Sequence, residues 1–226
     1  MTQAKLKEIN QGWETYYSSA NQDTLWKEDT EKFLLEHQNK IVENKKHCSI
    51  LDIGCGDGRN SFAWLEKGHS VCCVDVAKSG LQKISQKATG RNFQQPILLC
   101  EDFLQTNLLP ESFDVVQCFD ALAQINDAKM AITKLCDMAK SNAYIIFNYF
   151  TPDDCAFGEG EQLDEQTFTY KNTLFKFMFE KEIIALLPPT VEIIVAETRR
   201  WDDPPHGDYR PYPHTHEAAF FLLRKK

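Results

Sequence analysis

The amino-acid sequence predicts an α/β fold in which a mostly parallel β-sheet carries helices on both faces. From residue 48 onward, short apolar runs alternate with amphipathic stretches. The runs lack the polar–apolar alternation of a half-exposed strand, as is typical of strands buried on both faces. The last two runs are joined by a proline-rich loop with no helix between them. We therefore expect these two strands to form an antiparallel pair.

The elements follow in order along the chain. The first 45 residues are polar, and apolar residues at helical spacing between Asp29 and Lys45 predict one helix there, preceded by a looser segment. The predicted strands are CSILDI, SVCCVD, PILLC, FDVVQCF, AYIIFNYF, VEIIVAE and EAAFFLL. The predicted helices between them cover RNSFAWLEK, AKSGLQKISQKA, DAKMAITKLCDMAK and the stretch from Phe175 to Leu187, which Pro188 ends. Such alternation implies right-handed crossovers.

Composition limits the classes of function. A chain of 226 residues favours one domain, and a net charge of −8 makes a nucleic-acid partner unlikely in comparison with a small substrate. No apolar run approaches the roughly 20 residues of a membrane span, and the N-terminus has no signal or transit pattern. The eight cysteines form no C-x-x-C pair and lie mostly in apolar runs, which indicates reduced, buried thiols and a cytoplasmic protein. Nothing in the sequence indicates the oligomeric state.

The most specific feature is the stretch LDIGCGDGRN, residues 51–60, where a buried strand runs into three glycines and a helix follows. Glycines allow a tight turn and close approach of a ligand to the backbone. Asp75 ends the next strand, roughly 20 residues after Gly54, where a carboxylate can accept both hydroxyls of a ribose. Asp52 and Asp57 would repel a pyrophosphate but suit a cationic ligand. S-adenosylmethionine, with its ammonium, sulfonium and ribose, fits this pattern.

The ordered series LDIGCGDGRN, VD, CEDF and FD resembles the motifs of class I S-adenosylmethionine-dependent methyltransferases, over roughly residues 48–226. This resemblance implies an enzyme with a Rossmann-like, seven-stranded sheet of order 3-2-1-4-5-7-6, in which strand 7 is antiparallel. It also implies two parts, an N-terminal helical extension over residues 1–45 and a cofactor-binding domain over residues 46–226. Trp13, Tyr16 and Tyr17 lie where related enzymes carry a lid, although these rings would equally suit packing on the sheet.

The resemblance also implies roles for the residues of the glycine-rich loop. Asp52 and Gly54 should hold the methionine ammonium, directly or through water. Gly56 and Gly58 should let the loop approach the cofactor, and Cys55 belongs to the same cofactor-binding loop.

Further cofactor contacts follow from the later motifs. Asp75 should bind the ribose hydroxyls, and Val76 should pack on the adenine. Asp102 should accept a hydrogen bond from the adenine amino group, with the backbone of Phe103 beside it. Asp120 should lie near the methionine part and the acceptor, where it is also a candidate catalytic residue.

The acceptor side is less specific. Residues 199–217 should form a loop over the mouth of the site, and this loop holds the candidate catalytic residues His206, His214 and His216. His214 and His216 should share one face of the last strand. A general base, an acceptor-orienting group and an ordinary polar loop all fit these histidines. Their spacing alone does not support a ligand set, so no metal is assigned.

The acceptor class is narrowed by two features. The motif of exocyclic-amine and glutamine methylases, Asn/Asp-Pro-Pro-aromatic, does not follow the fourth strand. The histidine-rich tail and the acidic segment over residues 148–170 loosely resemble the tellurite- and thiopurine-type small-molecule methyltransferases. We therefore expect methyl transfer to a small molecule by in-line displacement. A protein or tRNA methyltransferase and a non-catalytic S-adenosylmethionine-binding sensor or partner protein remain the alternatives.

Overall fold

A computed structural model describes residues 3–19, 29–43, 45–205 and 210–226. Its central sheet has seven strands in the order β3-β2-β1-β4-β5-β10-β9. All neighbouring pairs are parallel except those that β10 makes with β5 and β9. This confirms the predicted fold and strand order. The strands are β1 (Ser49–Ile53), β2 (Ser70–Asp75), β3 (Ile97–Cys100), β4 (Phe113–Cys118), β5 (Ala139–Phe150), β9 (Val191–Asp203) and β10 (His214–Lys225).

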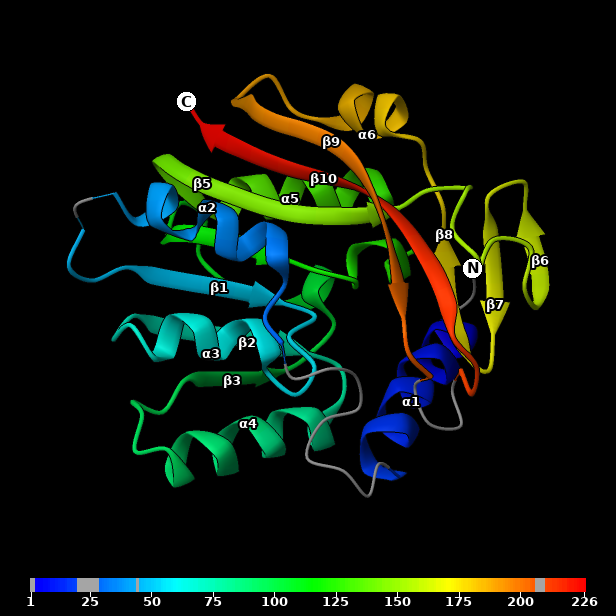
Figure 1. Cartoon of the computed structure of the whole chain (residues 1–226), viewed down its shortest axis with the longest axis horizontal. Coiled ribbons are helices and arrows are strands. Elements are labelled where there is room, and N and C mark those ends of the chain that lie inside the picture. Colours follow the sequence, from blue (N-terminus) through cyan, green and yellow to red (C-terminus); the bar gives the residue numbers. More distant parts are fainter. Residues whose placement is uncertain (1–2, 20–28, 44, 206–209) are drawn as a thin grey trace.

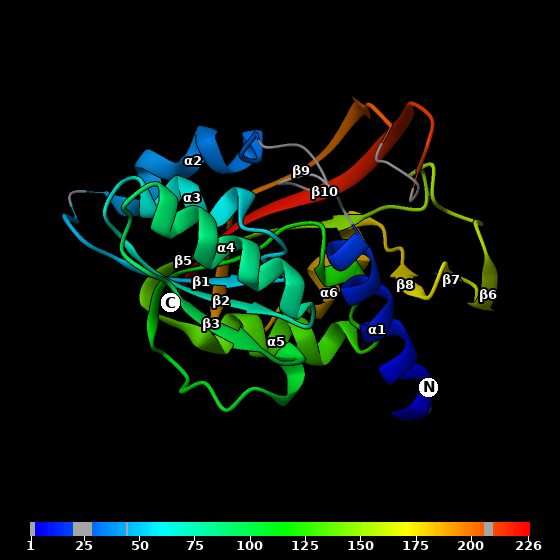
Figure 2. The same cartoon turned by 90° about the horizontal axis from the view of Figure 1, so that it is seen from below.

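Helices cover both faces of this sheet (Figure 2). One face carries α2 (Lys32–Val42), α3 (Arg59–Leu65) and α4 (Lys78–Gly90), and the other carries α5 (Ala128–Met138) and α6 (Glu180–Leu186). Two 3-10 turns, Phe103–Gln105 and Leu122–Gln124, follow β3 and β4. The core lies between these layers, where Phe33 of α2 contacts Phe220 of β10 at 5.2 Å between ring centroids. Among the described residues, no helix is both long and apolar enough to cross a membrane.

The prediction of a looser segment before residue 29 is wrong for residues 3–19, because Gln3–Ser19 forms helix α1. The Glu14 carboxylate accepts hydrogen bonds from the amide and hydroxyl of Ser79, in the first turn of α4. The Tyr16 hydroxyl donates to the carbonyl of Lys171 at 3.2 Å. Helix α1 is thus bonded to two separate parts of the domain, and these partners are far away in the sequence. It lies against α4 and β8 (Thr173–Lys176), as Figure 1 shows.

A small antiparallel sheet follows the loop after β5. It consists of β6 (Glu161–Asp164), β7 (Thr167–Tyr170) and β8 (Thr173–Lys176). The helix expected from Phe175 to Leu187 is therefore wrong at its start, since Phe175 lies in β8 and α6 begins only at Glu180. Lys171 and Asn172 have φ angles of 49° and 60° and form the two-residue turn between β7 and β8. Two consecutive positive φ angles give the turn whose twist matches a hairpin.

The predicted antiparallel pair at the end of the chain is confirmed, but its strands are longer than expected. β9 runs to Asp203 and β10 begins at His214, so residues 199–203 and 214–217 of the expected loop are strand. In this register Asp203 lies opposite His214, and Trp201 lies opposite His216. His206 lies outside the described residues.

Candidate cofactor and acceptor site

A continuous cavity of about 410 Å³ lies at the carboxyl ends of β1, β2 and β4, where open α/β sheets bind ligands. One end is formed by the glycine-rich loop and by the residues that follow β2 and β3. The other end is formed by the loop after β5 and by one face of β9 and β10. Cofactor and acceptor candidates from the sequence therefore line the same space. They are Gly54, Cys55, Gly56, Asp75, Val76, Asp102, Phe103, Asp120, His214 and His216.

The glycine-rich loop is tightly enclosed. Gly54, Gly56 and Gly58 have φ angles of 64°, 55° and 92°, a region that side chains disfavour. A Cβ atom at Gly54 would lie 2.1 Å from the Ala121 Cβ, and one at Gly56 would lie 2.2 Å from the Tyr17 hydroxyl. Glycine is thus required at these positions, and Tyr17 of α1 covers the loop.

Asp75 bridges the end of β2 and the glycine-rich loop. Its Oδ2 accepts the amide of Gly56 at 2.8 Å, and its Oδ1 accepts the amide of Ala77 at 2.8 Å. Burial raises the pKa of Asp75, while these backbone hydrogen bonds oppose the rise. Each carboxylate oxygen can accept a second hydrogen bond. The side chain is therefore held in place in the cavity wall with acceptor capacity to spare.

Asp52 lies one layer below the cavity rather than in its wall. Its carboxylate is 2 % exposed and accepts a hydrogen bond from the Ser61 hydroxyl at 2.5 Å. Burial raises the pKa of Asp52 to about 6, and the Ser61 hydrogen bond opposes this rise. From this position Asp52 does not reach a ligand ammonium in the cavity directly. Its charge could still act on the ammonium through the glycine-rich loop.

Asp102 and Phe103 line the cavity beyond β3. The Asp102 carboxylate accepts the amide of Leu104 at 2.9 Å and so caps the first 3-10 turn. Phe103 is almost fully buried. The cap explains the position of Asp102 without removing its capacity to accept a hydrogen bond from a ligand.

Cys55 is buried in the glycine-rich loop, and burial raises the pKa of its thiol well above the ordinary value.

Asp120 follows β4 with a φ angle of 56°, a left-handed conformation that is uncommon outside glycine. Two hydrogen bonds with Asn148 of β5 hold it there, one to its amide at 2.7 Å and one to its Oδ1 at 2.6 Å. Its Oδ2 pairs with Arg59 at 2.5 Å. The sequence reasoning missed Arg59 and Asn148, although Arg59 directly follows the third glycine.

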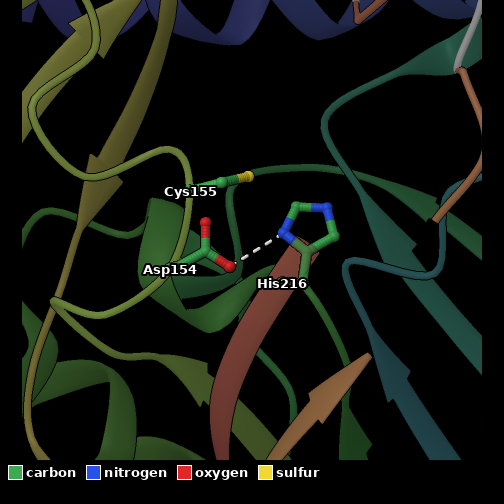
Figure 3. A group of neighbouring side chains, drawn as sticks. All are labelled: Asp154, Cys155 and His216. Carbon is green, nitrogen blue, oxygen red and sulfur yellow. Dashed lines mark hydrogen bonds and ion pairs between the residues drawn. The ribbon is translucent and has the colours of Figure 1, made fainter. Parts of the chain in front are cut away.

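The acceptor end contains an aspartate–histidine pair that sequence reasoning did not identify (Figure 3). The Nδ1 atom of His216 lies 2.8 Å from the Oδ2 atom of Asp154, in the loop after β5. The Asp154 side chain is buried and also accepts the amides of Ala156 and Glu217, each at 2.9 Å. The rings of Phe150 and Trp201 flank His216 at 5.4 and 5.5 Å between centroids.

The loop after β5 also holds Glu159, whose carboxylate pairs with the buried Arg210 at 2.8 Å. Arg210 also donates to the Cys155 sulfur at 3.1 Å. Burial raises the pKa of the Cys155 thiol to about 11. A thiol with this pKa is protonated near neutrality and is a poor nucleophile.

The segment that carries the glycine-rich loop is similar to known proteins. Residues 51–147 match the family described as "Methyltransferase domain". A ubiquinone biosynthesis O-methyltransferase of Idiomarina loihiensis is 35% identical over 119 residues, which cover 51% of this chain and 46% of that protein. Residues 51–147 are a methyltransferase domain.

Solved structures agree with the methyltransferase domain in fold. An S-adenosylmethionine-dependent methyltransferase of Methanosarcina mazei aligns with a TM-score of 0.66 at 19% identity, over 87% of this chain and 98% of that one. A protein of Pyrococcus horikoshii aligns with a TM-score of 0.65 at 15% identity, over 94% and 99% of the two chains. The predicted family is confirmed over residues 51–147, and the name of the Methanosarcina mazei neighbour agrees with the predicted cofactor, S-adenosylmethionine.

The family match covers only one part of the cavity. The chain spans about half the length of the curated relatives it matches. The methyltransferase domain match runs from β1 to β5 and contains Asp52, Asp75 and Asp120. Asp154, Asp203, His214 and His216 lie beyond its last residue. The family match therefore covers the glycine-rich end of the cavity and stops before the aspartates and histidines at the other end.

Proposed function

We propose that this protein transfers a methyl group from S-adenosylmethionine to a small-molecule acceptor. One observation carries the proposal: a continuous cavity joins the glycine-rich loop to the histidines of β10. Such a cavity has room for a cofactor at one end and for an acceptor at the other. The alternative of a non-catalytic sensor calls for bulky side chains in the acceptor end, and the cavity there is open.

The roles that the resemblance implies for the cofactor residues are compatible with the cavity wall. Asp75 binds the ribose hydroxyls, Val76 packs on the adenine, and Asp102 accepts from the adenine amino group. Gly54, Cys55, Gly56 and Gly58 shape the loop beside the methionine part. Asp52 acts from beneath this loop, through its charge. Asp120 lies near the methionine part, with Arg59 and Asn148 fixing its orientation.

A hydroxyl-bearing acceptor is supported by the relatives, whose names describe O-methyltransferases of ubiquinone biosynthesis. The rings of Phe150, Phe175 and Trp201 line the acceptor end and suit an apolar or aromatic molecule. The net charge of −8 disfavours tRNA, which leaves a protein acceptor as the second candidate. All eight cysteines are thiols, six of them buried, and a reducing compartment such as the cytoplasm suits them.

The reaction needs little covalent chemistry from the protein. The acceptor oxygen attacks the methyl carbon as the carbon–sulfur bond breaks, and its electrons go to sulfur, which becomes a neutral thioether. The acceptor hydroxyl gives up its proton to solvent. The enzyme aligns the two molecules and excludes water. We propose that α1 contributes as a lid, since Trp13 and Tyr17 line the cavity and Tyr17 covers Gly56.

Calorimetry tests the cofactor assignment. We expect S-adenosylmethionine and S-adenosylhomocysteine to bind with micromolar affinity and NAD not to bind. Asp75→Ala should weaken S-adenosylmethionine binding by about 1.5–3 kcal/mol, the scale of hydrogen bonds to a charged group. Asp153→Ala, an exposed carboxylate outside the cavity wall, is the control and should bind normally. NAD binding in the absence of S-adenosylmethionine binding would overturn the proposal.

A further inference from the structure

We propose that Asp203, His214 and His216 form a binding site for a divalent transition-metal ion at the acceptor end of the cavity. One carboxylate oxygen of Asp203 and one ring nitrogen of each histidine lie within 4.8 Å of one another. All three residues line the cavity. Two histidines and one carboxylate form a donor set typical of first-row metals, and three protein ligands leave positions open for a substrate.

The β9–β10 hairpin brings the three side chains together. Asp203 lies directly opposite His214 in the antiparallel register, and residues opposite each other share a face of the sheet. His216 lies two residues after His214, and so on the same face. The donor set is therefore built on paired strands rather than on a loop.

Hydrogen bonds fix which nitrogen of each histidine could bind a metal. The Nδ1 atom of His214 lies 2.9 Å from the carbonyl oxygen of Tyr212, which can only accept, so this nitrogen carries the proton. The Nδ1 atom of His216 faces the Asp154 carboxylate at 2.8 Å and carries its proton for the same reason. The Nε2 atoms of the neutral rings then have the lone pairs. Metal-binding histidines nearly always donate their other ring N–H to a carboxylate or carbonyl in this way.

The placement of the two rings agrees with a shared metal. With metal–nitrogen bonds of about 2.1 Å, two imidazoles at roughly 90–110° around one ion have centroids roughly 4.5–5.5 Å apart. The centroids of His214 and His216 are 4.7 Å apart, and the rings are nearly perpendicular at 88°. This spacing is compatible with two imidazoles around one ion.

A neighbouring cluster, Asp154, Cys155 and His216, also meets the distance criterion but is the weaker candidate. Both oxygens of Asp154 already accept backbone amides, and Oδ2 also faces His216. The Cys155 sulfur accepts from Arg210 at 3.1 Å, and a cationic donor at this distance opposes a cation. Asp154 is better suited to orient His216 than to bind the metal.

The metal's role in catalysis rests on the proposed function, whereas metal binding itself does not. A metal ion at this position would bind the acceptor hydroxyl and lower its pKa, as it does for bound water. The hydroxyl proton would leave to solvent, and the acceptor oxygen would attack the methyl carbon as the carbon–sulfur bond breaks, with no change in the oxidation state of the metal. The histidines would then act as ligands and not as bases.

Cobalt titration of the chelator-treated full chain tests the site. We expect one Co²⁺ ion per chain, with visible d–d absorption, displaceable by Zn²⁺. Asp203→Asn, His214→Ala and His216→Ala should each weaken Co²⁺ binding by more than about 100-fold, and Asp154→Asn by about 10–100-fold, as for an outer partner of a ligand. His47→Ala, whose ring bonds Gly68 and Ser70 away from the cavity, and Cys155→Ser are the controls and should bind normally.

Two further measurements distinguish a failure of the metal site from misfolding and from a failure of the proposed function. Circular dichroism reports whether each variant folds, and calorimetry with S-adenosylmethionine reports on the proposed function independently of the metal. Absence of Co²⁺ binding by the folded chain overturns the metal site. Binding that survives all three ligand substitutions, or a sulfur-to-cobalt charge-transfer band that disappears in Cys155→Ser, overturns this donor set. Full turnover by metal-free protein, lost on His216→Ala, overturns the metal's role in catalysis and assigns a base role to His216 instead.

Discussion

Among the single residues of the cavity, Asp52 has the environment with the clearest consequence for ligand binding. Burial raises its pKa to about 6, so much of the carboxyl is protonated below that pH in the ligand-free protein. A cationic ligand above the loop would favour the charged carboxylate. Binding of S-adenosylmethionine should therefore release a proton from Asp52.

The direction of the pH dependence of S-adenosylmethionine affinity follows from the linkage between proton release and ligand binding. Because the ligand-bound form holds fewer protons, affinity for S-adenosylmethionine should rise with pH, by about tenfold between pH 5 and pH 7. Asp52→Asn should flatten this dependence. Calorimetry in buffers of different ionisation enthalpy measures both the affinity and the proton released. A pH dependence that is unchanged in Asp52→Asn would assign the effect to another group.

Some residues of the cavity could be predicted from the sequence, and others could not. Asp75 and the three glycines were identifiable because their roles depend on local backbone geometry, a strand followed by a tight turn. Asp154 and His216 were not identifiable as a pair, because they meet only through the pairing of β10 with β5. Arg59 and Asp120 are likewise 61 positions apart, and their ion pair depends on how two loops pack.

At the scale of elements, α1 is the part of the fold whose role can be separated from the core. Its Tyr17 covers Gly56, and Glu14 binds the start of α4. The sheet, α2 and the other helices all follow residue 28. Local periodicity predicted most of these elements. The polar composition of the first residues hid α1, and the β7–β8 turn needed positive φ angles that Lys171 and Asn172 only weakly signal.

Deletion of residues 1–28 should therefore leave a folded domain with an open cofactor site. We expect S-adenosylmethionine to dissociate much faster and turnover to fall far more than Tm. Stopped-flow displacement of the cofactor and thermal unfolding compare the two effects. Tyr17→Ala should reproduce the faster dissociation within the full chain, whereas Tyr16→Phe, which removes only the hydroxyl bonded to Lys171, should not. Equal losses of turnover and stability would make α1 a structural element.

At the scale of the whole molecule, binding and stability are centred at opposite ends of the strands. The cavity lies at the carboxyl ends of β1 and β4. At the other end, Asp114 of β4 accepts the amide and hydroxyl of Ser49, at the start of β1, at 3.0 and 2.8 Å. Lys140 and Lys45 pair with the same carboxylate at 3.0 and 3.1 Å. Asp114 thus joins three neighbouring strands of the sheet far from any ligand.

This arrangement predicts a stability effect with a defined pH range. Burial alone would raise the pKa of Asp114, but the Ser49 and lysine hydrogen bonds lower it below its ordinary value. A carboxyl whose pKa is lower in the folded state stabilises the protein above its unfolded pKa, about 3.9, and this contribution is lost as the pH falls through the folded value. Asp114→Asn should lower the free energy of unfolding by about 1–2 kcal/mol at pH 7.

Urea unfolding of the wild-type protein and Asp114→Asn at pH 7, 5 and 3 measures this difference. The gap between the two proteins should be the same at pH 7 and pH 5, where the unfolded carboxyl is charged, and should shrink below about pH 4. Asp153→Asn is a matched control on an exposed carboxylate with no such network, and it should differ little from the wild type at any pH. S-adenosylmethionine affinity should be unchanged in Asp114→Asn, because the substitution lies at the opposite ends of the strands from the cavity. A gap that persists undiminished to pH 3 would show that the charge of Asp114 is not what stabilises the sheet, and altered cofactor affinity would show that its two ends are coupled.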